Sequence, residues 1–227
     1  RLILYYLKNG RTNIALYEAQ KMLKEAQEED DKTGLSRCYN IMSQIYTVKR
    51  LDSMAFEWQL KEIELTEKYD LENYNISQTY SQISSYYINT NQPEKALEAL
   101  KKADATAYSP TQKISVQLEY VNYYSKFGDM QAAEKILNEC KTAFDQDKRL
   151  WSIKKRLYNI EYVYYLQSKQ YPKALEAAKK QEAEELNLSE SIQNSVHYLT
   201  KGKIYSNMGN MSEAIKYLQM YIEAEDS

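Results

Sequence analysis

A tyrosine–alanine pair recurs about every 40 residues, and each tyrosine stands nine residues before its alanine. The six pairs are Tyr6 and Ala15, Tyr46 and Ala55, Tyr87 and Ala96, Tyr124 and Ala133, Tyr165 and Ala174, and Tyr205 and Ala214. Successive alanines are therefore 40, 41, 37, 41 and 40 positions apart. A fixed period of this length predicts that the chain folds as stacked copies of one supersecondary unit.

Each unit is predicted to be two helices joined by a short turn. A turn signal such as Asn9-Gly10 lies between every tyrosine and its alanine. Glycine readily takes the left-handed conformation that ends a helix, whereas Arg50 and Lys169, at the same place in other units, do so less easily. The 227 residues include only 5 glycines and 3 prolines, too few for the turns of a strand-rich fold. The sequence predicts an all-α protein.

The pattern resembles the tetratricopeptide repeat (TPR). In the last unit Tyr198, Gly202, Tyr205, Ala214 and Leu218 occupy the Trp, Gly, Tyr, Ala and Phe slots of the family pattern. The other units lack the glycine, no unit keeps the terminal proline, and the period is longer than the 34 residues typical of the family. The resemblance implies a right-handed superhelical solenoid of helix-turn-helix repeats. Its concave face would be lined by the first helix of each unit.

The repeats are expected to form one array over residues 1–227. We place a truncated first unit at 1–30 and full repeats at 35–70, 75–107, 110–146, 148–186 and 189–226. The first residues already follow a helical pattern and no initiator Met is present. We therefore expect the array to be part of a longer protein.

The resemblance also implies which side chains line the concave groove. Carried over unit by unit, these are Arg37, Asn40 and Gln44; Gln78, Ser81 and Ser85; Ser115, Leu118 and Asn122; Arg156, Asn159 and Val163; and Val196, Leu199 and Lys203. The candidate binding residues among them are Arg37, Asn40, Gln44, Gln78, Ser81, Asn122, Arg156, Asn159 and Lys203. Amide side chains carry donors and acceptors together, so they can hydrogen-bond an extended peptide of any sequence. The alternative is that these polar residues simply face water.

Composition argues against several other classes of function. Thirty Lys and Arg against 32 Asp and Glu give a net charge of -2, which provides no basic field for nucleic acid. The apolar runs are too short to span a bilayer. His197 is the only histidine, which argues against a metal site and a histidine-based triad, and no glycine-rich phosphate loop occurs. We expect neither catalysis nor a cofactor.

The sequence therefore predicts a non-enzymatic scaffold that binds a protein or an extended peptide. An alternative is the sensory input region of a bacterial signal-transduction regulator, either a histidine kinase or a helix-turn-helix transcription regulator. An apolar stripe of Tyr217, Leu218, Tyr221 and Ile222 on the last helix predicts that either more protein or a second copy, in a possible homodimer, covers this helix. The compartment stays open between cytoplasm and periplasm.

Overall fold

The computed structural model describes residues 2–185 and 190–226, and within these ranges it contains helices and no strand. The prediction of an all-α fold is confirmed. The residues form two compact units, Arg1–Ala107 (unit 1) and Tyr108–Ser227 (unit 2). The predicted boundary between repeats 148–186 and 189–226 falls at residues outside the described ranges.

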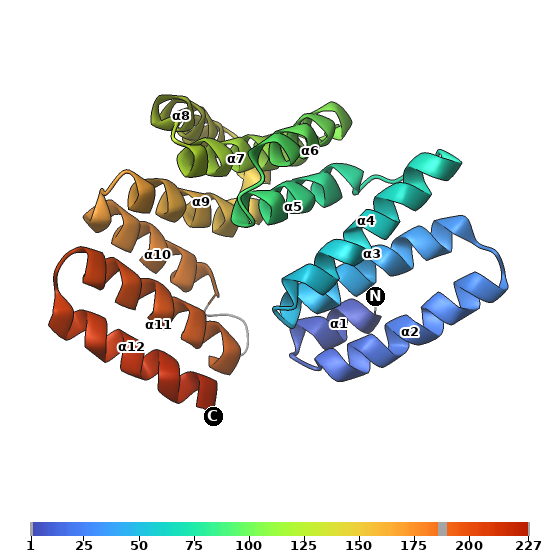
Figure 1. Cartoon of the computed structure of the whole chain (residues 1–227), viewed down its shortest axis with the longest axis horizontal. Coiled ribbons are helices and arrows are strands. Elements are labelled where there is room, and N and C mark those ends of the chain that lie inside the picture. The colour runs from blue at the N-terminus through green and yellow to red at the C-terminus, as the bar shows by residue number, and fades with distance from the viewer. Residues whose placement is uncertain (1, 186–189, 227) are drawn as a thin grey trace. The chain divides into compact units, whose positions relative to one another are not determined.

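Unit 1 is a row of helical hairpins, drawn from blue to green in Figure 1. In chain order they are α1 (Leu2–Lys8) with α2 (Thr12–Glu28), α3 (Lys32–Val48) with α4 (Asp52–Tyr69), and α5 (Ile76–Asn89) with α6 (Pro93–Thr106). Each helix packs against the next one along the chain. The first helix, α1, has only seven residues.

Unit 2 continues the same pattern of paired helices. It contains α7 (Pro110–Phe127) and α8 (Met130–Gln146), the 3-10 segment η1 (Lys148–Ile153), α9 (Lys154–Gln167) with α10 (Tyr171–Glu185), and α11 (Glu190–Asn207) with α12 (Met211–Asp226). A capping box begins α7: Ser109 accepts from the Gln112 backbone N–H, and the Gln112 side chain accepts from the Ser109 backbone N–H. The helix α7 packs against both α8 and α9.

The turn inside each hairpin has one geometry. The residue four positions after the repeat tyrosine has a positive φ angle at Gly10, Arg50, Asn91, Gly128, Lys169 and Gly209. In the two turns without Gly or Asn, the tyrosine carbonyl accepts from the backbone N–H five residues on, with Leu51 N to Tyr46 O at 2.9 Å and Gln170 N to Tyr165 O at 2.8 Å. A left-handed conformation costs a residue with a Cβ roughly 1 to 2 kcal/mol. The repeated packing of the hairpin therefore overrides the local preference of Arg50 and Lys169.

The alanine of each pair lies where the two helices of a hairpin approach closely. Ala15, Ala96, Ala133 and Ala174 are each 0% exposed. In the α5–α6 hairpin the Ser84 hydroxyl donates to the Ala96 carbonyl oxygen at 3.0 Å. Because Ala96 is also fully buried at this contact, a larger side chain there would overpack the two helices.

Replacing Ala96 with leucine is expected to lower the free energy of unfolding by about 1 to 3 kcal/mol, because the added atoms overpack the contact between α5 and α6. Urea unfolding followed by circular dichroism measures this effect. Ala105, exposed on the same helix, offers the matched control Ala105→Leu, which should change stability by no more than about 0.5 kcal/mol. Equal stability of the two variants would show that the repeat register is wrong.

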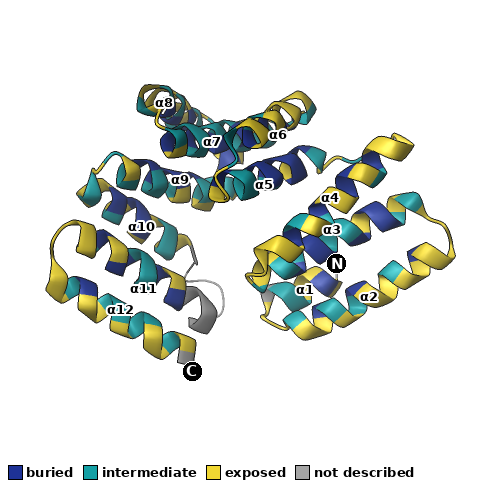
Figure 2. Ribbon diagram, viewed as in Figure 1, coloured by how far each residue is buried: buried dark blue, intermediate teal, exposed yellow. Residues whose placement is uncertain are grey.

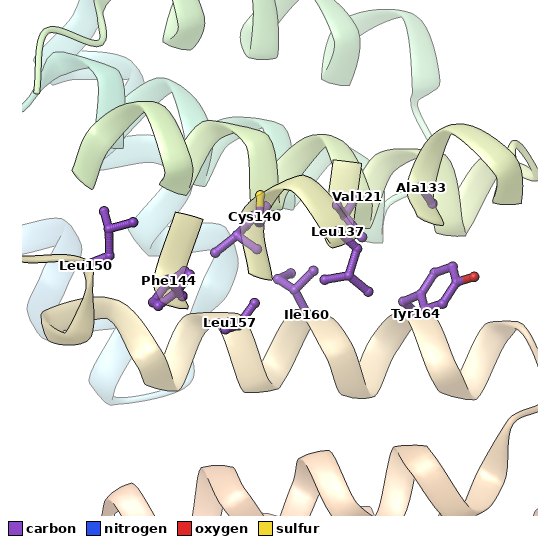
Figure 3. Close-up of a cluster of buried hydrophobic side chains, with 10 residues drawn as sticks. Val121, Ala133, Leu137, Cys140, Phe144, Leu150, Leu157, Ile160 and Tyr164 are labelled. Carbon is purple, nitrogen blue, oxygen red and sulfur yellow. The ribbon is translucent and has the colours of Figure 1, made fainter. Parts of the chain in front are cut away.

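Buried and exposed stretches alternate along the described helices in Figure 2, as expected for helices that bury one face. The largest buried cluster of unit 2 joins three helices. Val121 of α7, Leu137, Cys140 and Phe144 of α8, and Leu157, Ile160 and Tyr164 of α9 face one another in Figure 3. Leu118 of α7 belongs to the same cluster and is 0% exposed. This cluster holds α7, α8 and α9 together.

Candidate functional site

A groove lined by α1, α3, α4 and α5 is the candidate binding site of unit 1. It consists of three adjoining hollows of about 460, 520 and 400 Å³. The first and middle hollows share Leu4 and Gln44, and the middle and third share Thr47 and Gln82. We call these three hollows together the unit 1 groove.

A buried carboxylate lies at the base of the first hollow. Glu62 of α4 is 1% exposed and lines this hollow. It accepts hydrogen bonds from Asn40 Nδ2 at 3.1 Å, from Asn73 Nδ2 at 2.9 Å and from Thr79 Oγ1 at 3.1 Å. Burial raises the pKa of the Glu62 carboxyl, and the hydrogen bonds from Asn73, Asn40 and Thr79 act in the opposite direction. Three neutral donors thus hold the carboxylate in place.

Hydrogen bonds also hold the groove amides. Asn40 Oδ1 accepts from Gln44 Nε2 at 2.6 Å, so Gln44 uses its amino group within α3. On α5, Gln82 Oε1 accepts from Gln59 Nε2 at 3.2 Å, and Gln59 is itself buried. The groove therefore has an acceptor on Gln44 and a donor on Gln82 that these two hydrogen bonds do not use.

Apolar side chains line the middle hollow between these amides. Leu4 and Leu7 of α1 and Val48 of α3 border it, together with Gln44 and Gln82. Leu4 is 42% exposed and Val48 is 46% exposed, so both present apolar surface to a ligand. The hollow has the chemistry to bury an apolar side chain between two hydrogen-bonding amides.

The structure brings some of the predicted residues of unit 1 into this groove. Asn40 and Gln44 line it, and Arg37 lies exposed in the lining of the first hollow. Gln78 is exposed and does not line any of the three hollows. Ser81 is buried, and its hydroxyl donates to the Ser77 carbonyl oxygen at 3.0 Å. Sequence reasoning missed Gln82, one position further along α5.

The predicted residues of unit 2 have a different setting. Glu119, 2% exposed, accepts from Asn122 Nδ2 at 2.8 Å and from Arg156 at 2.8 Å. Both candidate residues are therefore bound to a buried carboxylate that joins α7 to α9. Asn159 and Lys203 are exposed. A binding role for these four residues stays a prediction.

The predicted apolar stripe of α12 is partly used within the α11–α12 hairpin. The Tyr217 ring stacks on the Tyr205 ring with centroids 5.6 Å apart. Leu218 packs against Gly202, where an added Cβ would lie 2.9 Å from the Leu218 side chain. Ile222 is 57% exposed. Only part of the predicted dimer surface therefore faces outward.

Groups suited to metal binding do not converge in the ranges that the structure describes. Among those residues no cluster of three His, Cys, Asp or Glu side chains could hold a metal ion. Both cysteines are buried, and burial raises the pKa of the Cys140 thiol to about 12. None of the helices in the described ranges has the length and apolar character to cross a membrane.

Hairpins with one shared turn and a buried alanine define a tetratricopeptide-repeat protein. The model of the tetratricopeptide repeat matches residues 198–226, which is the unit where the sequence pattern is most complete. The model of the 26S proteasome subunit RPN7 matches residues 47–178, more than half of the 227 residues. The chain therefore belongs to the family of the 26S proteasome subunit RPN7. No curated protein sequence matches it.

Solved structures share the same fold at low sequence identity. The apo form of RapI has a TM-score of 0.73 and 17% identity, over 98% of this chain and 79% of that one. A Rap protein complexed with competence and sporulation factor gives a TM-score of 0.70 and 13% identity, over 99% and 62% of the two chains. A putative kinesin light chain from Podosopora anserina gives 0.57 and 16%, over 80% and 90%. These likenesses establish the fold.

Proposed function

We propose that this protein is a non-enzymatic scaffold that binds an extended segment of a protein or peptide in the unit 1 groove. The observation that carries the proposal is an apolar hollow that is also lined by two hydrogen-bonding amides, Gln44 of α3 and Gln82 of α5. An extended peptide has an apolar side chain and main-chain N–H and C=O groups within a few ångströms of one another. The groove therefore offers a complementary group to each of them.

The charges around the groove agree with a ligand of ordinary composition. The middle hollow is lined by Leu4, Leu7, Gln44, Thr47, Val48 and Gln82, which carry no charge. The charged residues in the lining are Arg37, Glu62 and Glu72 in the first hollow and Asp52 in the third, and Glu62 is buried. A strongly acidic partner therefore has no preferred place here.

The similar structures support the same kind of role. One of them is a Rap protein in complex with competence and sporulation factor. We propose that this chain also binds a partner. Because its family is that of a 26S proteasome subunit, the proposed partner can be a larger protein with which the chain assembles.

The alternative function, a sensory input domain, depends on whether α12 associates with a second copy of the chain. Met211, Ile215 and Ile222 are exposed apolar side chains there, and they support a homodimer through this helix. An input domain would change its shape or its association when the ligand binds, whereas a scaffold would not. Light scattering with and without bound peptide separates the two functions.

Blocking the middle of the groove is expected to abolish binding. We would recover peptides from a display library of random 12-residue sequences and measure their affinity by isothermal titration calorimetry. Thr47→Arg should weaken binding at least about tenfold, because its side chain fills the space between the middle and third hollows.

Thr142 provides a matched control for this experiment. Both threonines are exposed on a helix and donate to the carbonyl oxygen four residues earlier, Thr47 to Ser43 at 2.9 Å and Thr142 to Asn138 at 3.0 Å. Thr142→Arg should therefore bind like the wild type. Recovery of no peptide, or equal affinities of Thr47→Arg and wild type, would contradict the proposed function.

A further inference from the structure

We infer that Glu62 is a positioning residue that sets the direction of the groove amides, so that Gln44 accepts a main-chain N–H from a bound peptide. The inference rests on the proposed function and adds to it which main-chain group of the peptide Gln44 recognises. The N–H belongs to the main chain beside an apolar side chain that enters the middle hollow. One chain of hydrogen bonds runs from the buried carboxylate through Asn40 to Gln44 in the groove.

The first step is the contact between Glu62 and Asn40. A carboxylate can only accept hydrogen bonds, and Glu62 lies 3.3 and 3.1 Å from Asn40 Nδ2 through its two oxygens. If Asn40 turned its oxygen toward Glu62, two acceptors would face each other in a buried place. The amide of Asn40 is therefore held with its amino group toward α4.

The second step passes this direction to Gln44. With Nδ2 turned to Glu62, Asn40 presents Oδ1 to the next turn of α3, where only a donor suits it. Gln44 supplies that donor through Nε2 at 2.6 Å. The Gln44 oxygen Oε1 is then the atom that can accept from a ligand in the hollows that Gln44 lines.

The surroundings of Glu62 explain why the direction is stable. The carboxylate also accepts from Asn73 in the loop before α5 and from Thr79 on α5, so its oxygens are fixed from three elements. The side chain is 1% exposed, which excludes competing water. Among the described residues, the charged side chains that line the same hollow are Arg37 and Glu72.

The apolar middle hollow determines which peptide side chain lies next to the main-chain N–H that donates to Gln44. Leu4, Leu7 and Val48 border the space next to Gln44. A peptide with a leucine, isoleucine, valine or methionine there buries its side chain while its main chain faces Gln44. Gln82, which lines the same hollow from α5, donates to a main-chain carbonyl of the same segment.

A double-mutant cycle tests whether Glu62 acts through Gln44. The probe is the tightest peptide recovered from the random 12-residue library, with each main-chain nitrogen methylated in turn in a set of variants. Glu62→Gln should weaken binding about five- to tenfold, the effect of one hydrogen bond that is lost or misaligned. Gln44→Met, which keeps the length but has no acceptor, should weaken binding by a similar factor.

The combination of the two substitutions gives the decisive readout. Adding Glu62→Gln to Gln44→Met should weaken binding less than about twofold further, because the acceptor that Glu62 positions is already absent. A purely structural role of Glu62 would weaken binding equally in both backgrounds and would overturn the inference. If Glu62→Gln does not fold, Asn40→Leu interrupts the same chain of hydrogen bonds and takes its place in the cycle.

The methylated peptides give an independent check. Methylation of the nitrogen next to the apolar side chain should weaken binding of the peptide to the wild type at least about fivefold. Gln44→Met should bind the methylated and the unmethylated peptide equally. If Thr47→Arg weakens binding of the peptide but methylation at no position does, the inference is contradicted and the proposed function stands. Recovery of no groove-binding peptide would overturn both.

Discussion

Replacing Arg156 with alanine is expected to lower the free energy of unfolding by about 3 kcal/mol, because a buried carboxylate loses its cation. Glu119 has 3% of its side chain exposed, and the Arg156 guanidinium contacts its Oε2 at 2.8 Å from the neighbouring helix α9. The hydrogen bond from Asn122 is neutral and cannot replace this charge. Urea unfolding followed by circular dichroism measures the loss.

Two further variants identify the cause of this loss. Arg149→Ala removes a surface ion pair with Asp147 and should have little effect on stability. Glu119→Gln combined with Arg156→Ala should be more stable than Arg156→Ala alone, because the buried negative charge that Arg156 balances is then absent. If Arg156→Ala is as stable as the wild type, Arg156 does not stabilise the contact between α7 and α9 and is again a candidate for ligand binding.

Replacing Leu118 with alanine is expected to lower the free energy of unfolding by about 2 to 5 kcal/mol, through lost burial and the cavity left behind. Leu118 is 0% exposed and belongs to the cluster that α7, α8 and α9 form in Figure 3. Urea unfolding of this variant also tests the position of Leu118, because a residue that lined a groove would affect binding and leave stability nearly unchanged.

An exposed leucine is the matched control for Leu118. Leu60 on α4 is 41% exposed, and Leu60→Ala should change stability by no more than about 0.5 kcal/mol. If Leu118→Ala and Leu60→Ala have the same effect, Leu118 does not lie in the core of unit 2.

The repeat made the fold predictable. The nine-residue interval from tyrosine to alanine spans the end of one helix, the turn and the start of the next helix, and each of these depends on residues close together in the sequence. The left-handed residue four positions after the tyrosine follows from the same interval. Even Arg50 and Lys169 adopt this conformation, which their chemistry alone does not favour.

The binding residues were harder to predict, because a helix turns about 100° per residue and its inner face depends on its neighbours. In α5 the groove is lined by Gln82, whereas the predicted Ser81 turns inward. In α7 the predicted Leu118 is part of the core. Of the positions carried over from the family pattern, Arg37, Asn40, Gln44 and Ser85 therefore line the groove, whereas Ser81 and Leu118 are buried.

Buried carboxylates were the other feature that sequence reasoning missed. Glu119 stands three residues before Asn122, a spacing at which two side chains share a helix face, and this was the signal available for that pair. Glu62 gave no such signal, because its donors come from α3, the loop before α5, and α5. Contacts of this kind appear only when the hairpins are packed together.

A crystal structure of the chain with a recovered peptide would show whether the unit 1 groove binds an extended peptide in one polarity. We expect the peptide to lie along α1, α3 and α5, with an apolar side chain between Leu4, Leu7 and Val48 and a main-chain N–H donating to Gln44 Oε1. A peptide bound on another surface, or a Gln44 that donates to the peptide through Nε2, would contradict it.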